Sequence, residues 1–309
     1  MTLMILLVSD MRGCWSAWER LKLLWVRFIS ACTWPWHFLN FFPEPQGHGS
    51  FRFASIVLKW YHIGMNLAIA EPPWTGLGKK LESATRKALF DFGLVTGVTN
   101  LGIALSGGKD SLTMLFLLKA ISGRGFPPFK ITAINVGGEF SCGAAVGGGY
   151  LDEVCKRLDI PLISRTSEKK LENLECYSCS RERRALLFKA ALDAGCEAIA
   201  FGHHADDNAQ TLLMNLFHKG EFAGLLPKLE MKDFGITIIR PLIYIQEADI
   251  KEFAKMYGFA RITCRCPVGQ NSVRKKTDAL ISDIEALFPN ARTNIASAGL
   301  IYGSKKASW

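Results

Sequence analysis

Short apolar runs alternate with longer segments of helical pattern from about residue 100 onward. The apolar runs predict strands at Leu101–Leu105, Lys130–Val136, Pro161–Arg165, Glu197–Phe201 and Ile236–Ile239. The longer segments predict helices at Leu112–Ala120, Tyr150–Leu158, Cys179–Ala194, Asp206–His218, Gln246–Tyr257 and Val273–Leu287. Such alternation is typical of an α/β fold, so we expect a doubly wound parallel sheet with helices on both faces.

The first 64 residues sustain neither a helical nor a strand period, although they hold six of the eight tryptophans. Their longest uncharged run, Phe28–Pro43, is shorter than the roughly 20 residues that span a bilayer. We expect residues 1–64 to be an apolar N-terminal extension outside the fold, with a membrane-surface anchor as the alternative. A helix predicted at Leu77–Phe92 then leads into the domain formed by residues 65–309.

A glycine-rich turn joins the first predicted strand to the helix that follows it. Two glycines let the backbone approach a ligand, and N–H groups at a helix start favour an anion. A lysine adds a cation and an aspartate adds a ligand that suits Mg²⁺. The turn therefore predicts a phosphate site, although it is neither a Walker loop nor a GxGxxG motif. Its residues are Ser106, Gly107, Gly108, Lys109, Asp110 and Ser111.

A second polar turn follows the fourth predicted strand and contains Gly202, His203 and His204, with Asp206 and Asp207 just after it. Ligands of doubly wound sheets bind at the carboxyl ends of the strands. Because both turns follow strands, we expect them to meet at this edge and to share a nucleotide and its metal ion.

Charge and cysteine content add a polyanionic partner and thiol chemistry to this picture. The formal net charge is +9, and nine cysteines in a chain of this length indicate a reducing compartment with reactive or metal-bound thiols. Cys176 and Cys179 form a CxxC at a predicted helix start. The residues alone allow a redox pair, a zinc site completed by Cys264 and Cys266, or an iron–sulfur cluster.

Several motifs resemble those of known enzymes. The turn at residues 106–111 resembles the SGGxDS signature of the PP-loop ATP pyrophosphatases, a branch of the HUP-like folds. Residues 176–184 resemble the CxxCSRxRR segment, and residues 202–207 the GHHxDD segment, of the tRNA 2-thiocytidine synthetases. Arg240–Leu242 is similar to their RPL. The resemblance runs from about Met65 to about Pro289.

The resemblance implies an enzyme that uses ATP and Mg²⁺ to adenylate the 2-oxo group of cytidine 32 in tRNA and then replaces it with sulfur. It implies catalytic roles for Asp110, Cys176, Cys179 and Asp207, and a [4Fe–4S] cluster on Cys176, Cys179 and Cys264. The role of Cys266 stays open because it lies one position off the family's second cysteine. Asp110 would hold Mg²⁺, and nucleotide contacts fall on the 106–111 turn with Gly202 and His203.

The same resemblance implies that Arg181, Arg183 and Arg184 contact tRNA. It further implies a sulfur donor such as a cysteine desulfurase, a cytoplasmic location without membrane attachment, and a chain that is compatible with a homodimer. Two other PP-loop tRNA enzymes, the isoleucine-tRNA lysidine synthetases and the thiouridine synthetases, remain alternatives. A nucleotide- or redox-sensing module without catalysis is the alternative from another class.

Overall fold

The computed structural model describes residues 67–138, 147–167, 176–259 and 272–304. The chain divides into two units, Met1–Met65 and Asn66–Trp309, and the fold below belongs to the second. The predicted extension at residues 1–64 lies outside the described residues.

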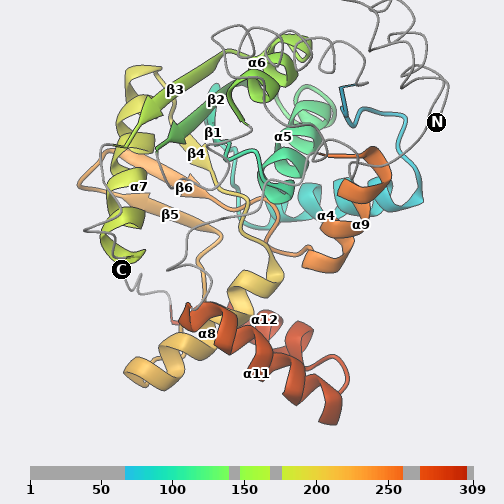
Figure 1. Cartoon of the computed structure of the whole chain (residues 1–309), viewed down its shortest axis with the longest axis vertical. Coiled ribbons are helices and arrows are strands. Elements are labelled where there is room, and N and C mark those ends of the chain that lie inside the picture. Colours follow the sequence, from blue (N-terminus) through green and yellow to red (C-terminus); the bar gives the residue numbers. More distant parts are fainter. Residues whose placement is uncertain (1–66, 139–146, 168–175, 260–271, 305–309) are drawn as a thin grey trace, which may run out of the picture. The chain divides into compact units, whose positions relative to one another are not determined.

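The second unit is an α/β fold built on one six-stranded sheet (Figure 1). Its strand order is β3-β2-β1-β4-β6-β5, and every neighbouring pair is parallel except β6 with β5. The strands are β1 Asn100–Ala104, β2 Lys130–Gly137, β3 Leu162–Thr166, β4 Ala198–Ala200, β5 Lys228–Met231 and β6 Ile236–Ile239. The prediction of a doubly wound α/β sheet is confirmed, with the antiparallel β5 as an addition at its edge.

The helices follow the predicted order with small shifts at their ends. They are α4 Gly76–Asp91, α5 Lys109–Ile121, α6 Gly147–Arg157, α7 Cys176–Asp193, α8 Ala205–Lys219, α9 Glu247–Tyr257, α11 Val273–Leu287 and α12 Ala291–Tyr302. Within the described ranges, none of them combines the length and the apolar composition that crossing a bilayer requires. Helix α6 begins at Gly147, three residues before its predicted start at Tyr150, and residues 139–146 lie outside the described residues.

Two elements carry too weak a pattern for prediction from the sequence. Strand β5 has four residues, and its sequence, KLEM, pairs with β6 in a register that sets Lys228 opposite Ile239. Helix α12 is rich in alanine, serine and glycine, so its apolar face is poorly marked. Its start is set instead by Asn290, whose φ of 73° lies in the left-handed region that asparagine tolerates.

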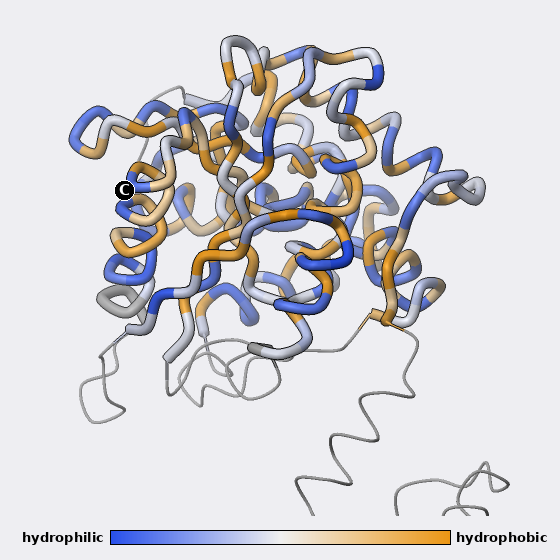
Figure 2. The backbone as a smooth tube through the Cα atoms, turned by 90° about the horizontal axis from the view of Figure 1, so that it is seen from above, coloured by the Kyte–Doolittle hydropathy of each residue, from blue (hydrophilic) through white to orange (hydrophobic). Residues whose placement is uncertain are grey.

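The sheet has an apolar cluster on each face. Residues Ala133 and Ile134 are neighbours in β2 but belong to different clusters, because successive side chains of a strand point to opposite faces. One cluster joins the sheet to α4, α5, α6 and α9, and the other joins it to Phe188, Ala190 and Ala191 of α7. The tube view shows apolar positions gathered in the strands and the helices that cover them (Figure 2).

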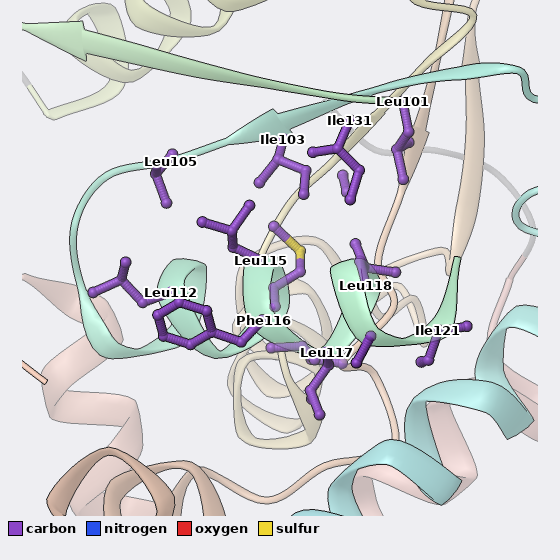
Figure 3. Close-up of a cluster of buried hydrophobic side chains, with 14 of the residues drawn as sticks. Leu101, Ile103, Leu105, Leu112, Leu115, Phe116, Leu117, Leu118, Ile121 and Ile131 are labelled. Carbon is purple, nitrogen blue, oxygen red and sulfur yellow. The ribbon is translucent and has the colours of Figure 1, made fainter. Parts of the chain in front are cut away.

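Helix α5 is the centre of the larger cluster, and most of its side chains are buried. Leu112, Leu115 and Leu118 of this helix face Leu101, Ile103 and Leu105 at and after β1 (Figure 3). Each fully buried leucine contributes about 1.5–3 kcal/mol to folding. The packing therefore fixes the direction of α5, and with it the position of the turn that precedes the helix.

Helix α8 packs with α11 and α12 around a third apolar cluster. Buried Asn208 links these parts, because its Nδ2 donates to the carbonyl of Ala296 at 2.8 Å and its Oδ1 accepts from the N–H of Leu225 at 2.6 Å. Helix α12 is thereby held beside the first turns of α8, which follow directly on the second polar turn.

Candidate active site

The turn at residues 106–111 follows β1, the strand at which the strand order of the sheet reverses. β1 pairs with β2 on one side and with β4 on the other, and ligands of doubly wound folds bind at such a position. Helix α5 begins at Lys109, three residues before its predicted start. Lys109, Asp110 and Ser111 therefore lie in the first helical turn, where N–H groups have no carbonyl partner within the helix and can meet an anion.

Glycine and serine shape this turn. Gly107 has a φ of 81°, in the left-handed region that favours glycine. The hydroxyl of Ser106 accepts from the N–H of Gly108 at 3.3 Å and lies 3.1 Å from the hydroxyl of Ser111, which donates to the carbonyl of Gly108 at 3.0 Å. These contacts hold the loop in one shape.

The second polar turn lies directly against the first. A Cβ atom on Gly202 would come within 3.1 Å of the carbonyl carbon of Asp110 and within 3.2 Å of the N atom of Ser111. These distances are tighter than nine in ten real Cβ contacts, so a side chain at Gly202 would require the backbone of the first turn to shift by a few tenths of an ångström. The predicted meeting of the two turns at the carboxyl edge is confirmed.

Lys109 is held by two carboxylates. Its Nζ lies 3.0 Å from both carboxylate oxygens of Asp110 and 2.9 Å from Oε1 of Glu247 in the first turn of α9. Burial alone would lower the pKa of Lys109, but Asp110 and Glu247 raise it. Lys109 is therefore a fixed cation beside the phosphate turn.

A buried histidine at the start of α8 is surrounded by three aspartates. His204 lies 3.5 Å from Asp206, 3.4 Å from Asp207 and 3.7 Å from Asp110, measured between ring nitrogen and carboxylate oxygen. Burial would lower the pKa of His204, but the three carboxylates raise it. Burial would likewise raise the pKa of Asp206 and Asp207, yet His204 and nearby cations lower both. The cluster favours charged histidine and charged aspartates together.

The neighbouring His203 is kept neutral. Burial and the adjacent Arg240 lower the pKa of His203 to about 3. Its ring stacks on Phe201 at 5.7 Å between centroids, and its Nδ1 accepts from Nε of Arg240 at 3.3 Å. His203 therefore presents a neutral, oriented ring to the site.

A cavity of about 350 Å³ lies at this edge, within the size range of small-molecule sites. Its lining divides into an apolar part, contributed by β1, β2, α7 and β4, and a polar part, contributed by both turns and two arginines. The apolar part includes Leu105, Ile134, Val136, Leu187 and Phe201, and the polar part Ser106, Asp110, Ser111, Arg183, His203, Asp207 and Arg274. The lining therefore offers apolar contacts that suit a ring and polar side chains that suit charged groups.

Two charged residues of the site were not predicted from the sequence. Arg274 of α11 lines the cavity, and its Nη1 lies 2.6 Å from Oδ1 of Asp207. Glu247 contacts Lys109 from α9. Both depend on how distant helices pack against the sheet, although the acidic start of α9, just beyond a strand end, was a usable hint for Glu247.

The predicted arginines on α7 differ in their surroundings. Arg183 lines the cavity and donates from Nη2 to the carbonyl of Val136 at 3.0 Å. Arg184 donates to the carbonyl and the hydroxyl of Ser180, both at 3.1 Å. Arg181 lies on the exposed surface of the same helix. Their predicted contact with RNA stays a prediction.

The structure describes the helix that contains two of the predicted cluster cysteines, but it describes none of the cluster cysteine side chains. Helix α7 begins at Cys176, so Cys176 and Cys179 occupy its first turn, but their side chains lie outside the described residues. Cys264 and Cys266 also lie outside them, between Phe259 and the start of α11. Among the described side chains, no group of three or more histidine, cysteine, aspartate or glutamate residues is arranged to hold a metal ion.

Replacing His204 by asparagine is expected to destabilise the protein more at pH 6 than at pH 9. A histidine with a raised pKa stabilises the fold fully below its unfolded value of about 6.5, and that contribution is lost as the pH rises through the folded value. The lowered pKa values of Asp206 and Asp207 affect stability in a lower pH range. Their stabilising contribution is present above about pH 4 and is lost as the pH falls further. The measurement is urea unfolding of wild type and variant at pH 6 and pH 9, without nucleotide or divalent cations, and it compares the loss in free energy of unfolding at the two pH values.

His218→Asn is the matched control, because His218 lies exposed in the last turn of α8. Its effect should differ less between pH 6 and pH 9 than the effect of His204→Asn. An effect of His204→Asn that does not change between pH 6 and pH 9 would contradict a charged His204.

Comparison with known proteins points to one family. The PP-loop domain model matches residues 79–263. The tRNA-cytidine(32) 2-sulfurtransferase of Syntrophotalea carbinolica is 31% identical over 72% of this chain and 88% of that protein, and the one of Paraburkholderia phytofirmans is 35% identical over 72% and 68%. The structure of the U34-tRNA thiolase NcsA from Methanococcus maripaludis with its [4Fe–4S] cluster superposes with a TM-score of 0.58 at 25% identity, over 72% of this chain and 78% of that one. The chain therefore belongs to the PP-loop domain family, among the tRNA-cytidine(32) 2-sulfurtransferases.

Proposed function

We propose that this chain is an ATP-dependent tRNA sulfurtransferase that converts cytidine 32 of tRNA to 2-thiocytidine. The observation that carries the proposal is the cavity at the switch point of the sheet. The phosphate turn, the second polar turn and Arg183 of α7 all reach this one cavity. Cys179 precedes Arg183 by one helical turn, about 6 Å along the axis. A nucleotide in the cavity and thiols at the start of α7 would therefore lie near one substrate base.

ATP suits a cavity that is lined by both apolar and polar side chains. The adenine ring would lie among Ile134, Val136 and Phe201, and the phosphates would meet the N–H groups at the start of α5 with Lys109 beside them. Gly202 and His203 would close the nucleotide site from the second turn. Asp110 lines the same cavity and would hold Mg²⁺, which offsets negative charge on the phosphates.

The cysteines are suited to an iron–sulfur cluster in chemistry and spacing. Cys176 and Cys179 are three residues apart in the sequence of α7, a spacing at which two residues of a helix can share a ligand. The segment with Cys264 leads directly into α11, whose Arg274 lines the same cavity. Cys176, Cys179 and Cys264 would hold [4Fe–4S] and leave one iron open, and the role of Cys266 stays open. When bound, the cluster supplies a site that carries sulfide for transfer.

The reaction has two steps, and each exchanges one bond. In the first, O2 of the cytidine attacks the α-phosphorus of ATP, and the bond to the β-phosphate oxygen breaks to release pyrophosphate. In the second, a sulfide forms a bond to C2 of the base, and the C2–O bond breaks to release AMP. The fixed cation Lys109 stabilises the charge that moves onto the pyrophosphate, and Asp207 keeps His204 and Arg274 in place.

Several further features belong to the proposal. Arg181 and Arg184 would contact tRNA phosphates, while Arg183 lies where a splayed base or the nucleotide would meet it. A cysteine desulfurase would act as the sulfur donor, and the enzyme would work in the cytoplasm, as a monomer or a homodimer. Residues 1–64 would stay outside the catalytic domain.

Anaerobic purification followed by iron, sulfide and zinc analysis tests this function together with a thiolation assay. We expect about four irons per chain. With ATP, sulfide and tRNA, the protein should form 2-thiocytidine at position 32. Zinc in place of iron would contradict the cluster. Thiouridine as the product, or lysidine when lysine replaces sulfide in the assay, would favour the other PP-loop enzymes. No product with either co-substrate would favour a sensing module.

A further inference from the structure

Glu247 joins the phosphate turn to a helix that the sequence motifs do not include. Its Oε1 lies 2.9 Å from Nζ of Lys109, and its Oε2 lies 2.8 Å from Nζ of Lys251 one turn further along α9. The side chain of Glu247 is 27% exposed and that of Lys251 is 61% exposed. Glu247 therefore reaches into the site, while its second partner lies at the surface.

The backbone around Glu247 is fixed independently of its side chain. The N–H of Glu247 donates to Oδ2 of Asp206 at 2.7 Å. Oδ1 of Asp206 lies 3.5 Å from Nη1 of Arg292 on α12, and the same arginine lies 2.5 Å from Asp278 on α11. A change of the Glu247 side chain leaves these contacts intact, so it can be tested without moving the start of α9.

We infer that Glu247 is a positioning residue that holds Lys109 toward the scissile phosphates during adenylation. This inference rests on the proposed function, since it concerns the same nucleotide site. Lys109 has a flexible four-carbon stem and three donors, which a single neighbouring carboxylate would not fix in direction. Asp110 and Glu247 approach it from two elements, α5 and α9, and together define where its ammonium group lies.

The same contact has an opposite effect on nucleotide binding. The carboxylate of Glu247 lies 2.9 Å from the ammonium group that is proposed to meet the triphosphate, and like charges repel. Lys109 must also divide its donors between two carboxylates and the phosphates. Glu247 should therefore weaken the binding of ATP while it raises the rate of the chemical step, a pattern expected when an interaction serves the transition state rather than the ground state.

The test compares Glu247→Gln with the wild-type protein by two measurements. The first is the Kd of the α,β-methylene analogue of ATP with Mg²⁺, measured by calorimetry without tRNA. The second is the maximum rate of pyrophosphate release with ATP and tRNA. We expect the Kd to fall about three- to tenfold and the maximum rate to fall at least about tenfold. General damage to the site would weaken binding and slow the reaction together.

Two further variants sharpen the test. Glu247→Asp keeps the charge but shortens the reach, so it should slow pyrophosphate release without tightening the binding of the analogue. Lys251→Gln removes only the surface partner of Glu247 and should leave both measurements within twofold of the wild type. An unchanged or higher Kd of the ATP analogue in Glu247→Gln would overturn the inference, and so would a maximum rate of pyrophosphate release within twofold of the wild type. Absence of 2-thiocytidine in the wild type would instead contradict the proposed function. The Kd comparison could still be made in that case, because it needs no tRNA.

Discussion

Cys176→Ala is expected to abolish 2-thiocytidine formation while nucleotide binding stays within twofold of the wild type. Cys176 is the first residue of α7, whereas the phosphate turn at residues 106–111 lies between β1 and α5. A [4Fe–4S] cluster held by three thiolates should be lost when one of them is removed. The measurements are iron content, the Kd of the ATP analogue and thiolation after anaerobic purification.

Cys155→Ala provides the matched control for this variant. Cys155 lies buried in α6, and burial raises the pKa of its thiol to about 11, so it stays protonated and is a poor metal ligand. This variant should keep its iron and its thiolation. Full thiolation by Cys176→Ala would refute the assigned role of Cys176.

Asp110→Asn is expected to lower the rate of pyrophosphate release at least about 100-fold, because the charge that Mg²⁺ and Lys109 require is lost. Both carboxylate oxygens of Asp110 lie 3.0 Å from Nζ of Lys109, and the residue is in the first turn of α5. Asparagine has nearly the same shape, so the fold should be kept. Stopped assays that measure pyrophosphate with tRNA and ATP follow this effect.

Asp249→Asn is the control for Asp110, since Asp249 also lies in the first turn of a helix but pairs with Lys80 at the surface. It should release pyrophosphate at the wild-type rate. If Asp110→Asn kept more than half of the wild-type rate, Asp110 would not be the metal ligand. Together the two variants separate the halves of the reaction, because Cys176→Ala should block only the second half and Asp110→Asn should block the first.

The parallel part of the sheet could be predicted from the sequence, because its strands are short apolar runs with helices between them. The predicted bounds of β6 and α11 agree with the structure, and the other elements shift by a few residues. Strand β5 and helix α12 were not predicted, because a four-residue edge strand and a helix of small residues leave little periodic signal. The local sequence pattern therefore predicts the parallel strands of the sheet better than its antiparallel edge strand β5.

The candidate site divides in the same way. The two polar turns were predicted to meet because the carboxyl ends of neighbouring parallel strands share one edge. Glu247 and Arg274 were not predicted, since they reach the site only through the packing of α9 and α11. The predicted RNA contact of Arg183 stays a prediction, and the structure adds that Arg183 lines the cavity and donates to the carbonyl of Val136 in β2. Side chains brought in by distant helices need the tertiary structure.

The close approach of Gly202 to Asp110 and Ser111 has a consequence for affinity. The two turns touch backbone to backbone, and the buried strands β1 and β4 hold them from behind. The spacing between the two sides of the nucleotide site is thus set before any ligand arrives. Such preorganisation means that binding need not order the two turns against each other, so more of the interaction energy of the nucleotide remains for the reaction itself.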